Sequence, residues 1–483
     1  MSDKRVRNLH RGELPALDAL IKLLRLDSRS LGRLALEGDD LLIRSRHRLV
    51  DAVGIAQLLI GAAAAEIWRV RTDIVTDIAV DTVDALHSLH ASHFVWQQGA
   101  YVEVGSEYVP LNGFHPTRDD RQILLCAGPP YMKLLNAYLD FFNCGNNRKS
   151  VDAVTARYTA EELENALADL GLPGCRAFDR HEWLAHPQGR ALATTPPIEI
   201  VKIADGDPVP FQFGAKHPLD GVRVLDFTHV LAGPHSTQSL AKLGAEVLHI
   251  SSPLHADTLP QHLGVDMGKY SAYLNLTDTN QLSRMHDLAA TADVFASSYR
   301  GTVAERFGLT PEELASRSKN GIVTMSVNAY GYSGPWANRG GFDFNGQAAS
   351  GFASAEGDSV RNPKLSPVYY LADLMSGYFA AAGMLAALLR RATEGGSYHV
   401  KVSLTRSAMW VQELGLLDDD SIADLPLKDV YPHRATIART AFGEVATLEN
   451  PLRFSRLPLP HNERLVPYGA DRPEWRPQTA PAR

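Results

Sequence analysis

The sequence predicts an α/β protein with an open parallel sheet in a large domain and a second, smaller α/β domain. Strand-like and helical segments alternate over residues 218–412, a pattern typical of an open parallel sheet. A second mixed pattern covers residues 91–205, and a stretch rich in Pro, Gly and Asp at 206–217 is the predicted linker. The 483 residues suffice for two or three domains with substantial cores.

Residues 1–90 are predicted to be a helical region. Residues 1–40 are predicted to be amphipathic helix, because the segment ALDALIKLLRL repeats Leu and Ile at helical spacing. Residues 49–71 are predicted to form an Ala-rich helix. IVTDIAVD (74–81) alternates like a short strand. In the small domain, RQILLCAG indicates a buried strand, and the next helix is expected to start at Thr159 and stop at Gly171.

The large domain is predicted to contain strands separated by helical patterns. The strand candidates are GVRVLDFT (221–228), EVLHI (246–250), ADVFASS (292–298) and GIVTMSVNA (321–329). A helix over QSLAKLGAEV is expected to end at Gly244. Residues 413–483 are rich in Pro and Arg near their end and are predicted to be an extended tail over the surface.

Composition excludes several classes of function. The net charge is −7 and the basic residues are scattered, so no nucleic-acid partner is expected. Three cysteines fit neither a disulfide framework nor a zinc pattern, which predicts a cytoplasmic location, and the histidines show no metal-binding motif. The start has no apolar signal segment, and Gln57 and Glu66 interrupt the apolar run near residue 52, so no membrane span is expected.

An Ala-rich helix with an acid at its front occurs twice. Asp51, Gly61, Ala65 and Arg69 match Asp373, Gly383, Ala387 and Arg391 without a gap, which predicts a divergent internal repeat. Similar composition alone is the alternative explanation. An alternating apolar segment follows both helices, IAVDTVDAL in one case and HVKVSLTRSAMW in the other, and this favours the repeat.

Three stretches have the composition of a ligand site. The turn at Gly233 and Pro234, between a strand and a helix, could present backbone N–H groups to a phosphate, although the turn taken alone favours a plain tight βα turn. It lacks GxGxxG, so no nicotinamide or flavin is predicted. Arg300 and Arg306 follow a predicted strand, where arginine could hold phosphate or simply face solvent.

Other candidates have equally ordinary explanations. Lys269 lies at a loop-to-strand boundary, where we expect it to be merely exposed unless it contacts a ligand. The Gly-dense loop around Asp343 could approach a ligand closely or be an ordered surface loop. Asp373 taken alone could be a first-turn acid that stabilises its helix by about 0.3–1 kcal/mol.

A resemblance to the class III CoA-transferases begins with PLDGVRVLDFTHVLAGPHSTQSLAKLGAEVLHISSP. This family includes formyl-CoA:oxalate and carnitine CoA-transferases, with α-methylacyl-CoA racemase as a divergent branch. Four further segments follow in the family's order, namely ADVFASSYRGTVAERFGL, NAYGYSGPWANRGGFDFNGQAASG, LADLMSGYFAAAGMLAALLRRATEGGSYHVKVSL and AFGEVATLENPLRFSRLP. The resemblance implies a Rossmann-like CoA-binding domain, a smaller domain reached by two linkers, and interlocked homodimers.

The resemblance also implies roles for individual residues. Asp373 takes the position of the catalytic aspartate, whose carboxylate attacks an acyl-CoA thioester to form a mixed anhydride. CoA is then a substrate, and no permanently bound cofactor is expected. The expected contacts to CoA are His229, Val230, Leu231, Ala232, Lys269, Ser298, Tyr299, Arg300, Arg306 and Asp343.

Departures from the family pattern keep two alternatives open. The racemase branch has a His where this chain has Phe342, and because Phe cannot move a proton, racemisation or another isomerisation is disfavoured. Ser251 and Ser252 replace residues that the family places near CoA, which leaves a catalytically inactive CoA-binding subunit as the second alternative. The sequence does not identify the acyl donor or the acceptor acid.

The order of the domains differs from that of a standard member. Here the segments that resemble the family's small domain precede the Rossmann-like domain, and the Asp51 helix would end a truncated first copy. We therefore predict two incomplete copies that build one unit, with Asp373 as its working carboxylate and Asp51 as a structural residue. Whether the copies form an intrachain pseudo-dimer or a true homodimer is left open.

Overall fold

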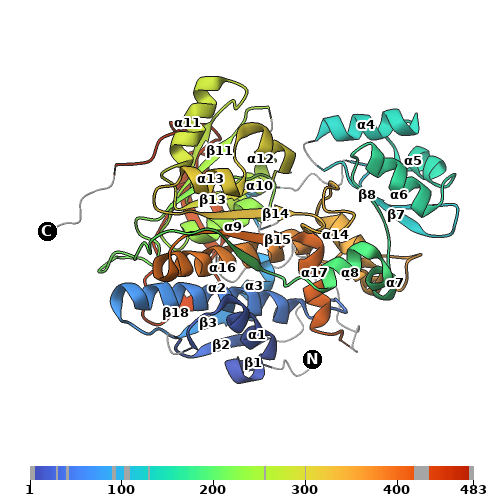
Figure 1. Ribbon diagram of the computed structural model, residues 1–483. Coiled ribbons are helices and arrows are strands. Elements are labelled where there is room, and N and C mark those ends of the chain that lie inside the picture. The colour runs from blue at the N-terminus through green and yellow to red at the C-terminus, as the bar shows by residue number, and fades with distance from the viewer. Residues whose placement is uncertain are drawn as a thin grey trace.

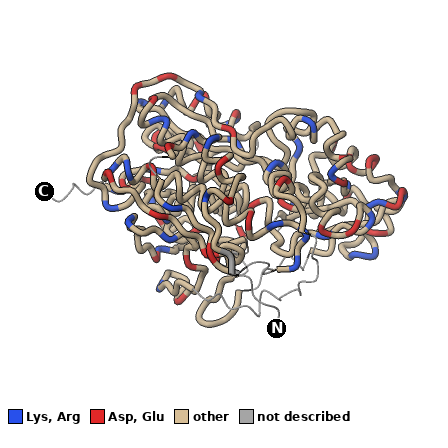
Figure 2. The backbone as a smooth tube through the Cα atoms, turned by 90° about the horizontal axis from the view of Figure 1, so that it is seen from below, with Lys and Arg blue, Asp and Glu red and all other residues tan. Residues whose placement is uncertain are grey.

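The protein folds into a large lobe around a seven-stranded sheet and a small lobe around a three-stranded sheet (Figure 1). The computed structural model describes residues 6–28, 31–39, 43–89, 94–102, 109–128, 131–254, 257–299, 301–417 and 435–477. In this part of the chain, basic and acidic residues are interspersed along both lobes in the view of Figure 2. The three cysteines are free.

The large sheet confirms the predicted α/β class. Its strand order is β12-β11-β10-β13-β14-β15-β9, and only β9 runs antiparallel to its neighbour. The strands are β10 (Arg223–Phe227), β11 (Glu246–Ser251), β12 (Tyr270–Tyr273), β13 (Val294–Ser297), β14 (Val323–Asn328), β15 (Ser397–Ser403) and β9 (Glu199–Ala204). The order reverses between β10 and β13, so the crevice at their carboxyl ends is where an open α/β sheet binds its ligand.

Helices connect and cover these strands. They are α9 (Ala232–Ala241), α10 (Leu259–Val265), α11 (Thr279–Ala289), α12 (Gly301–Phe307), α13 (Pro311–Arg317), α14 (Asp343–Ala349), α15 (Phe352–Glu356), α16 (Leu371–Glu394) and α17 (Leu404–Glu413). Helix α9 begins directly after the turn, earlier than the predicted 238–247, and Gly244 follows it with a φ of +104°. A glycine adopts this left-handed conformation without steric cost, so it suits the end of the helix.

The N-terminal region is not purely helical, and the expected helix across residues 1–40 is wrong. Within the described residues the helical part of this stretch is η1 (Arg11–Glu13) and α1 (Pro15–Leu24), flanked by β1 (Val6–His10) and β2 (Leu34–Asp39). Helix α2 (Leu49–Thr72), β3 (Ile78–Asp81) and α3 (Thr82–Ser88) follow. Strand β18 (Leu452–Phe454) returns from near the C-terminus to complete a β1-β2-β3-β18 sheet. That pairing is non-local, so no local sequence pattern reveals it.

Helices α2 and α16 pack against each other at the centre of the molecule. Both are long and apolar enough to cross a membrane by composition, but in this fold their most apolar windows are 89% and 100% buried. A helix that is apolar on all sides is typical of the core of a large protein. A small residue also allows α16 to pack closely on the large sheet, since Gly383 faces Val400 and Ile198.

The small lobe is built from β6 (Gly113–Pro116), β7 (Gln122–Leu125) and β8 (Gly174–Arg176). Helices α4 (Met132–Phe142), α5 (Arg148–Thr155) and α6 (Ala160–Asp169) pack around it, and α7 (Arg180–Ala185) and α8 (Pro187–Ala193) lead back to the large sheet. Helix α6 starts as predicted, with a capping box on Thr159. A further sheet pairs β16 (Ala435–Thr440) and β17 (Gly443–Leu448) with β4 (Trp96–Gln97) and β5 (Ala100–Tyr101).

The predicted linker crosses from β9 to β10 without helix or strand. Arg71 of α2 holds the end of the linker that leads into β10. The Arg71 guanidinium donates hydrogen bonds to the carbonyl oxygens of Gln212, Pro218 and Asp220 at 3.0, 2.7 and 2.8 Å. The linker is therefore fixed to the N-terminal region.

Candidate active site

Two carboxylates meet at the N-terminus of α16. Asp373 lies in the first turn of this helix and is 8% exposed. Its backbone N–H donates to Asp343 Oδ2 at 2.7 Å, and Asp343 is the first residue of α14. Gln347 also donates to Asp343, through its side-chain amide. The Gly-dense loop therefore delivers an acid to the front of the long buried helix.

The protonation of each of these two carboxyl groups depends on the other. Burial raises the pKa of Asp373 well above its ordinary value, and the nearby Asp343 carboxylate raises it further. Burial also raises the pKa of Asp343 to about 7, although its hydrogen bonds from Asp373 N–H and Gln347 oppose the shift. Two acids that share a buried site do not ionise together, so the pair retains a proton near neutral pH.

Asp373 faces a pocket of about 420 Å³ between the two lobes. The large lobe supplies Val230, Gln261, Phe342, Asp343, Phe344, Tyr370 and Asp373, and the small lobe supplies Asn112, Cys126, Gly128 and Tyr131. The Tyr131 hydroxyl is hydrogen-bonded to His229 Nδ1 at 2.5 Å, and its ring stacks on Phe342 with centroids 5.7 Å apart. Both lobes of one chain thus build the pocket.

The turn between β10 and α9 forms the adjoining wall. His229 N–H donates to Ser298 Oγ at 2.9 Å, and Val230 N–H donates to Asp257 Oδ2 at 2.9 Å. Val230 has a φ of +68°, and Tyr369, just before α16, has a φ of +49°. Left-handed backbone at residues other than glycine costs energy and clusters at functional sites. Leu231 and Ala232 are buried at the start of α9.

The other predicted CoA contacts lie in different surroundings. The Tyr299 ring packs at a tilt against the rings of His229 and Phe227, with centroids 4.6 and 4.5 Å away, so with Ser298 it joins the crevice at the switch point. Arg306 is exposed on α12, with its guanidinium 5.1 Å from the ring of Phe307. Arg300 lies outside the described residues.

Lys269 is not exposed, contrary to the expectation for an isolated lysine at a loop boundary. It is 2% exposed, and its ammonium donates to Asp226 Oδ2, Asp266 Oδ1 and Pro234 O at 3.0, 2.8 and 2.8 Å. Lys269 therefore lies beneath the β10–α9 turn, where it is better placed to support the turn than to contact a ligand. A direct contact between Lys269 and CoA stays a prediction.

The same cluster has the geometry of a metal site. Asp226, His249 and Asp266 each bring a ligand atom within 4.8 Å of the others. The Lys269 ammonium already bonds both carboxylates, and together with His249 it holds the pKa of Asp226 well below the ordinary value, even though burial alone would raise it. The protein's own cation therefore neutralises the cluster.

Several site residues were not singled out from the sequence. Tyr131, Asn112 and Asp257 line or buttress the pocket, and none belongs to a recognisable motif. For Tyr131 one signal existed, since it follows the predicted strand RQILLCAG across a Gly-Pro-Pro turn, and such strand ends carry functional loops. Asp51, by contrast, lies 3.7 Å from Arg48 on α2 and is absent from the pocket lining.

Comparison with known proteins identifies the large lobe. The model of CoA-transferase family III matches residues 219–446, just under half of the chain. This part of the chain is therefore similar to CoA-transferase family III. The matched segment contains the β10–α9 turn, Asp343 and Asp373, the features around which the pocket is built.

The relatives of this family segment are CoA-transferases by name. "Acetyl-coenzyme A transferase nodX" of Hypoxylon pulicicidum is 34% identical over 44% of this chain and 36% of its own length. "Probable fatty acyl-CoA transferase Rv3272" of Mycobacterium tuberculosis is 35% identical over 40% of this chain and 52% of its own. A crystal structure of Rv3272 covers 41% of this chain and 57% of that one at 35% identity, with a TM-score of 0.38. The chain thus spans between a third and about half of the curated relatives.

Proposed function

We propose that this protein transfers coenzyme A between an acyl-CoA thioester and a carboxylic acid, with Asp373 as the group that accepts the acyl chain. The observation that carries the proposal is the position of the Asp373 carboxylate. It lines a pocket beside the β10–α9 turn, where an open α/β sheet binds its ligand. CoA would be a substrate, and no resident cofactor takes part in the proposed reaction.

The proposed reaction passes through a mixed anhydride, an aspartyl thioester and a second mixed anhydride, so that CoA moves from one acid to the other. The ionised Asp373 attacks the thioester carbonyl, the C–S bond breaks, and CoA leaves as a thiolate, which gives a mixed anhydride. The thiolate then attacks the aspartyl carbonyl, releases the first acid and forms an aspartyl thioester. The acceptor carboxylate attacks that thioester and expels CoA thiolate again, and the thiolate attacks the acceptor's carbonyl in the new anhydride. The products are the new acyl-CoA and free Asp373.

Asp343 would set the protonation state of the nucleophile. Because the two carboxylates share a proton near neutral pH, Asp373 is reactive only when that proton lies elsewhere. Asp343 accepts the backbone N–H of Asp373, so a change in its charge is felt directly at the front of α16. A substrate that excludes water from the pocket would strengthen this coupling.

The crevice between β10 and β13 would hold the CoA. We assign contacts to His229, Val230, Leu231, Ala232, Ser298 and Tyr299, which lie at the carboxyl ends of these two strands. Arg306, exposed on α12, would reach the charged phosphate end of the molecule. Arg300 and Asp343 complete the proposed set. Lys269 was also expected to contact CoA, but the burial of its side chain disfavours that contact.

Trapping the acyl-enzyme tests the proposal. The protein is incubated with acetyl-CoA, succinyl-CoA or a longer acyl-CoA and then with hydroxylamine, which converts an activated aspartate to a hydroxamate. Peptide mass spectrometry should find the hydroxamate on Asp373, and Asp373→Asn should abolish both the adduct and CoA exchange. The matched control is Asp51→Asn, which removes the equivalent acid of α2. Tight CoA binding with no adduct would instead mean an inactive CoA-binding subunit.

We also propose that the chain contains an internal duplication. A constant offset of 322 positions relates α2 to α16 at both ends and aligns the first residue of α3 with that of α17. Strands β2 and β3 are parallel and β18 pairs antiparallel with β3, just as β14 and β15 are parallel and β9 pairs antiparallel with β15. These correspondences support two incomplete copies around one site.

The packing of two glycines supports the duplication independently. Gly61 of α2 faces Ile78 of β3 and Leu452 of β18, and Gly383 of α16 faces Val400 of β15 and Ile198, the residue just before β9. Ile78 and Val400 are themselves 322 positions apart. We further propose that the protein is cytoplasmic and that two chains associate as a homodimer, which size-exclusion chromatography with light scattering would test.

A further inference from the structure

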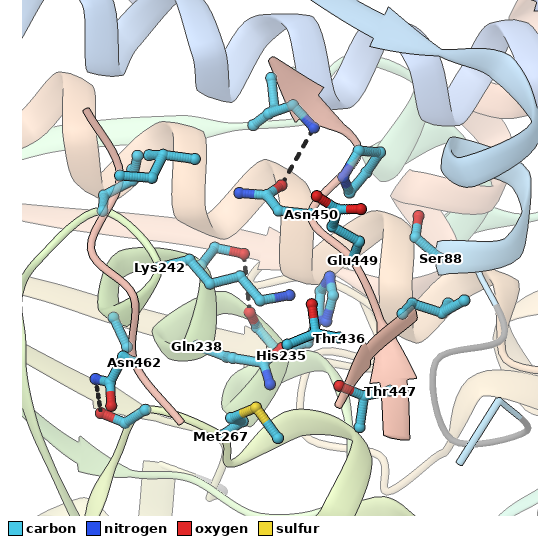
Figure 3. A pocket seen from close by; sticks show the side chains of 18 of the residues that line it. Ser88, His235, Gln238, Lys242, Met267, Thr436, Thr447, Glu449, Asn450 and Asn462 are labelled. Atoms are coloured by element: carbon cyan, nitrogen blue, oxygen red, sulfur yellow. Dashed lines mark hydrogen bonds between the residues drawn. The ribbon is translucent and has the colours of Figure 1, made fainter. Parts of the chain in front are cut away.

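A second pocket lies where α2, α3 and the segments 436–462 meet α9, and it shares no described lining residue with the candidate active site. Its empty volume is about 1270 Å³, and three distant parts of the chain enclose it. Gln57 and Ser88 come from α2 and α3, and α9 supplies one wall. The hairpin β16–β17 and the segments 449–452 and 459–462 supply the rest (Figure 3).

Buried polar atoms without partners line this pocket. His235 is 4% exposed, and within the described part of the chain neither of its ring nitrogens has a hydrogen-bond partner. The same holds for Oε1 of Gln57, which is 1% exposed and whose amide nitrogen donates to Ser88 and Tyr378. Buried polar atoms are nearly always hydrogen-bonded, so orphans that face a cavity indicate a missing partner.

A cation stands beside these atoms. Lys242 follows α9, and among the described residues no carboxylate lies within ion-pair distance of its ammonium. Burial lowers the pKa of Lys242 to about 8, which leaves the group mainly protonated at neutral pH. Figure 3 shows His235 of α9 and Lys242, which directly follows α9, projecting into the pocket, with the carboxylate of Glu449 drawn across from them. His235 is neutral, because burial and Lys242 lower its pKa to about 3.

The two sides of the pocket require different chemistry from a ligand. Lys242 and one N–H of the neutral His235 are donors, and a carboxylate satisfies both. Gln57 Oε1 and Glu449 are acceptors, so the ligand must also carry a hydroxyl or amino group. Among the residues that the structure describes, no arginine lines the pocket, which disfavours a polyphosphate.

We propose that this second pocket binds a small carboxylic acid that also bears a hydroxyl or amino group, at a site separate from Asp373. The proposal does not depend on the proposed transferase reaction, since no residue of that reaction lines the pocket. The ligand's carboxylate pairs with Lys242 and His235, and its second group donates to Gln57 or Glu449. The acid joins the N-terminal region, α9 and the C-terminal segment, so its binding stabilises the fold.

Protection of Lys242 from chemical labelling tests the proposal on the unaltered protein. The full chain is trace-acetylated with acetic anhydride alone or with L-lactate, L-malate or L-glutamate, and labelling of each lysine is read by peptide mass spectrometry. At least one of these acids should slow the labelling of Lys242 threefold or more while leaving Lys202 unchanged. Propionate, which lacks the second group, and lactamide, which lacks the carboxylate, should protect less.

Binding measurements with variants locate the site. Lys242→Gln should weaken the binding of the protective acid at least tenfold by calorimetry, while the surface control Lys202→Gln and the active-site variant Asp373→Asn should bind normally. Failure of all three acids to protect Lys242, or equal protection by propionate, overturns the proposal. So does binding that survives Lys242→Gln but is lost in Asp373→Asn. Because the labelling uses the native chain, the result decides the matter even if Lys242→Gln fails to fold.

Discussion

Replacement of Lys269 by methionine separates two roles for this residue. Methionine keeps most of the side-chain length but removes the ammonium that bonds Asp226, Asp266 and the carbonyl of Pro234. Both carboxylates stay buried, and removing one partner of a buried ion pair costs about 3–5 kcal/mol because a charge is left uncompensated. His249, 3.3 Å from Asp226, offsets part of this cost. We expect the free energy of unfolding to fall by about 3 kcal/mol or more.

The functional consequence follows from the connections of the same network. Asp226 accepts hydrogen bonds from Thr228 in the β10–α9 turn and from Thr237 of α9, and Lys269 bonds the carbonyl oxygen of Pro234 in the first turn of α9. Loss of the ammonium should therefore loosen the turn, so that stability and CoA affinity fall together. If Lys269 instead touches CoA directly, affinity falls while stability is retained.

Two measurements decide between these outcomes. Urea denaturation followed by fluorescence gives the change in stability, and calorimetric titration with CoA gives the affinity. The matched control is Lys202→Met, because Lys202 is an exposed residue paired with Asp205 at 2.8 Å, and such surface pairs contribute about 0–1 kcal/mol. A Lys269→Met protein as stable as the control would refute the reasoning.

Three further predictions concern the acids and the two long helices. Asp51→Asn should leave turnover within about threefold of the native rate in an assay of CoA exchange, since its partner is Arg48 and it lies outside the pocket. The pKa of Asp343 is raised to about 7, so its contribution to stability is present below about pH 4 and is lost as the pH rises to about 7. In Asp343→Asn, thermal midpoints should accordingly decline less between pH 5 and pH 8 than in the native protein, and an equal decline would contradict the assignment. Gly61→Val and Gly383→Val should each lower the free energy of unfolding by about 1–3 kcal/mol in urea titrations, because a Cβ at either position lies within 3.0 Å of the facing strands' side chains; a neutral result at either would argue against the close packing.

Sequence reasoning predicted the elements whose signals are local. The strands of the large sheet alternate with helices at readable spacing, and the acid at the front of α16 was recognisable from its motif. Of the N-terminal sheet, the sequence predicted only β3, from IVTDIAVD. Its pairing with β18 could not be predicted, because β18 arrives from more than 370 positions away. Lys269 was expected at the surface because one of its partners, Asp226, is 43 positions distant, and no local pattern marks such a pair.

Tyr131 shows why the pocket itself could not be drawn from the sequence. Its bond to His229 depends on how the small lobe docks, and that docking is a property of tertiary packing between segments 98 positions apart. The sequence identified both acids of the carboxylate pair as candidates, but it did not show that they lie together. Their direct contact depends on the path of the Gly-dense loop.

Strand β9 matters for any attempt to express the family segment, residues 219–446, as a separate fragment. It precedes residue 219, yet it hydrogen-bonds along β15 and covers what would otherwise be an open sheet edge. Helix α2, also outside the segment, shields one flank of α16. A fragment cut at the homology boundary would expose an unpaired strand and an apolar helix face, both of which invite aggregation. The evolutionary unit and the folding unit of this chain therefore have different borders.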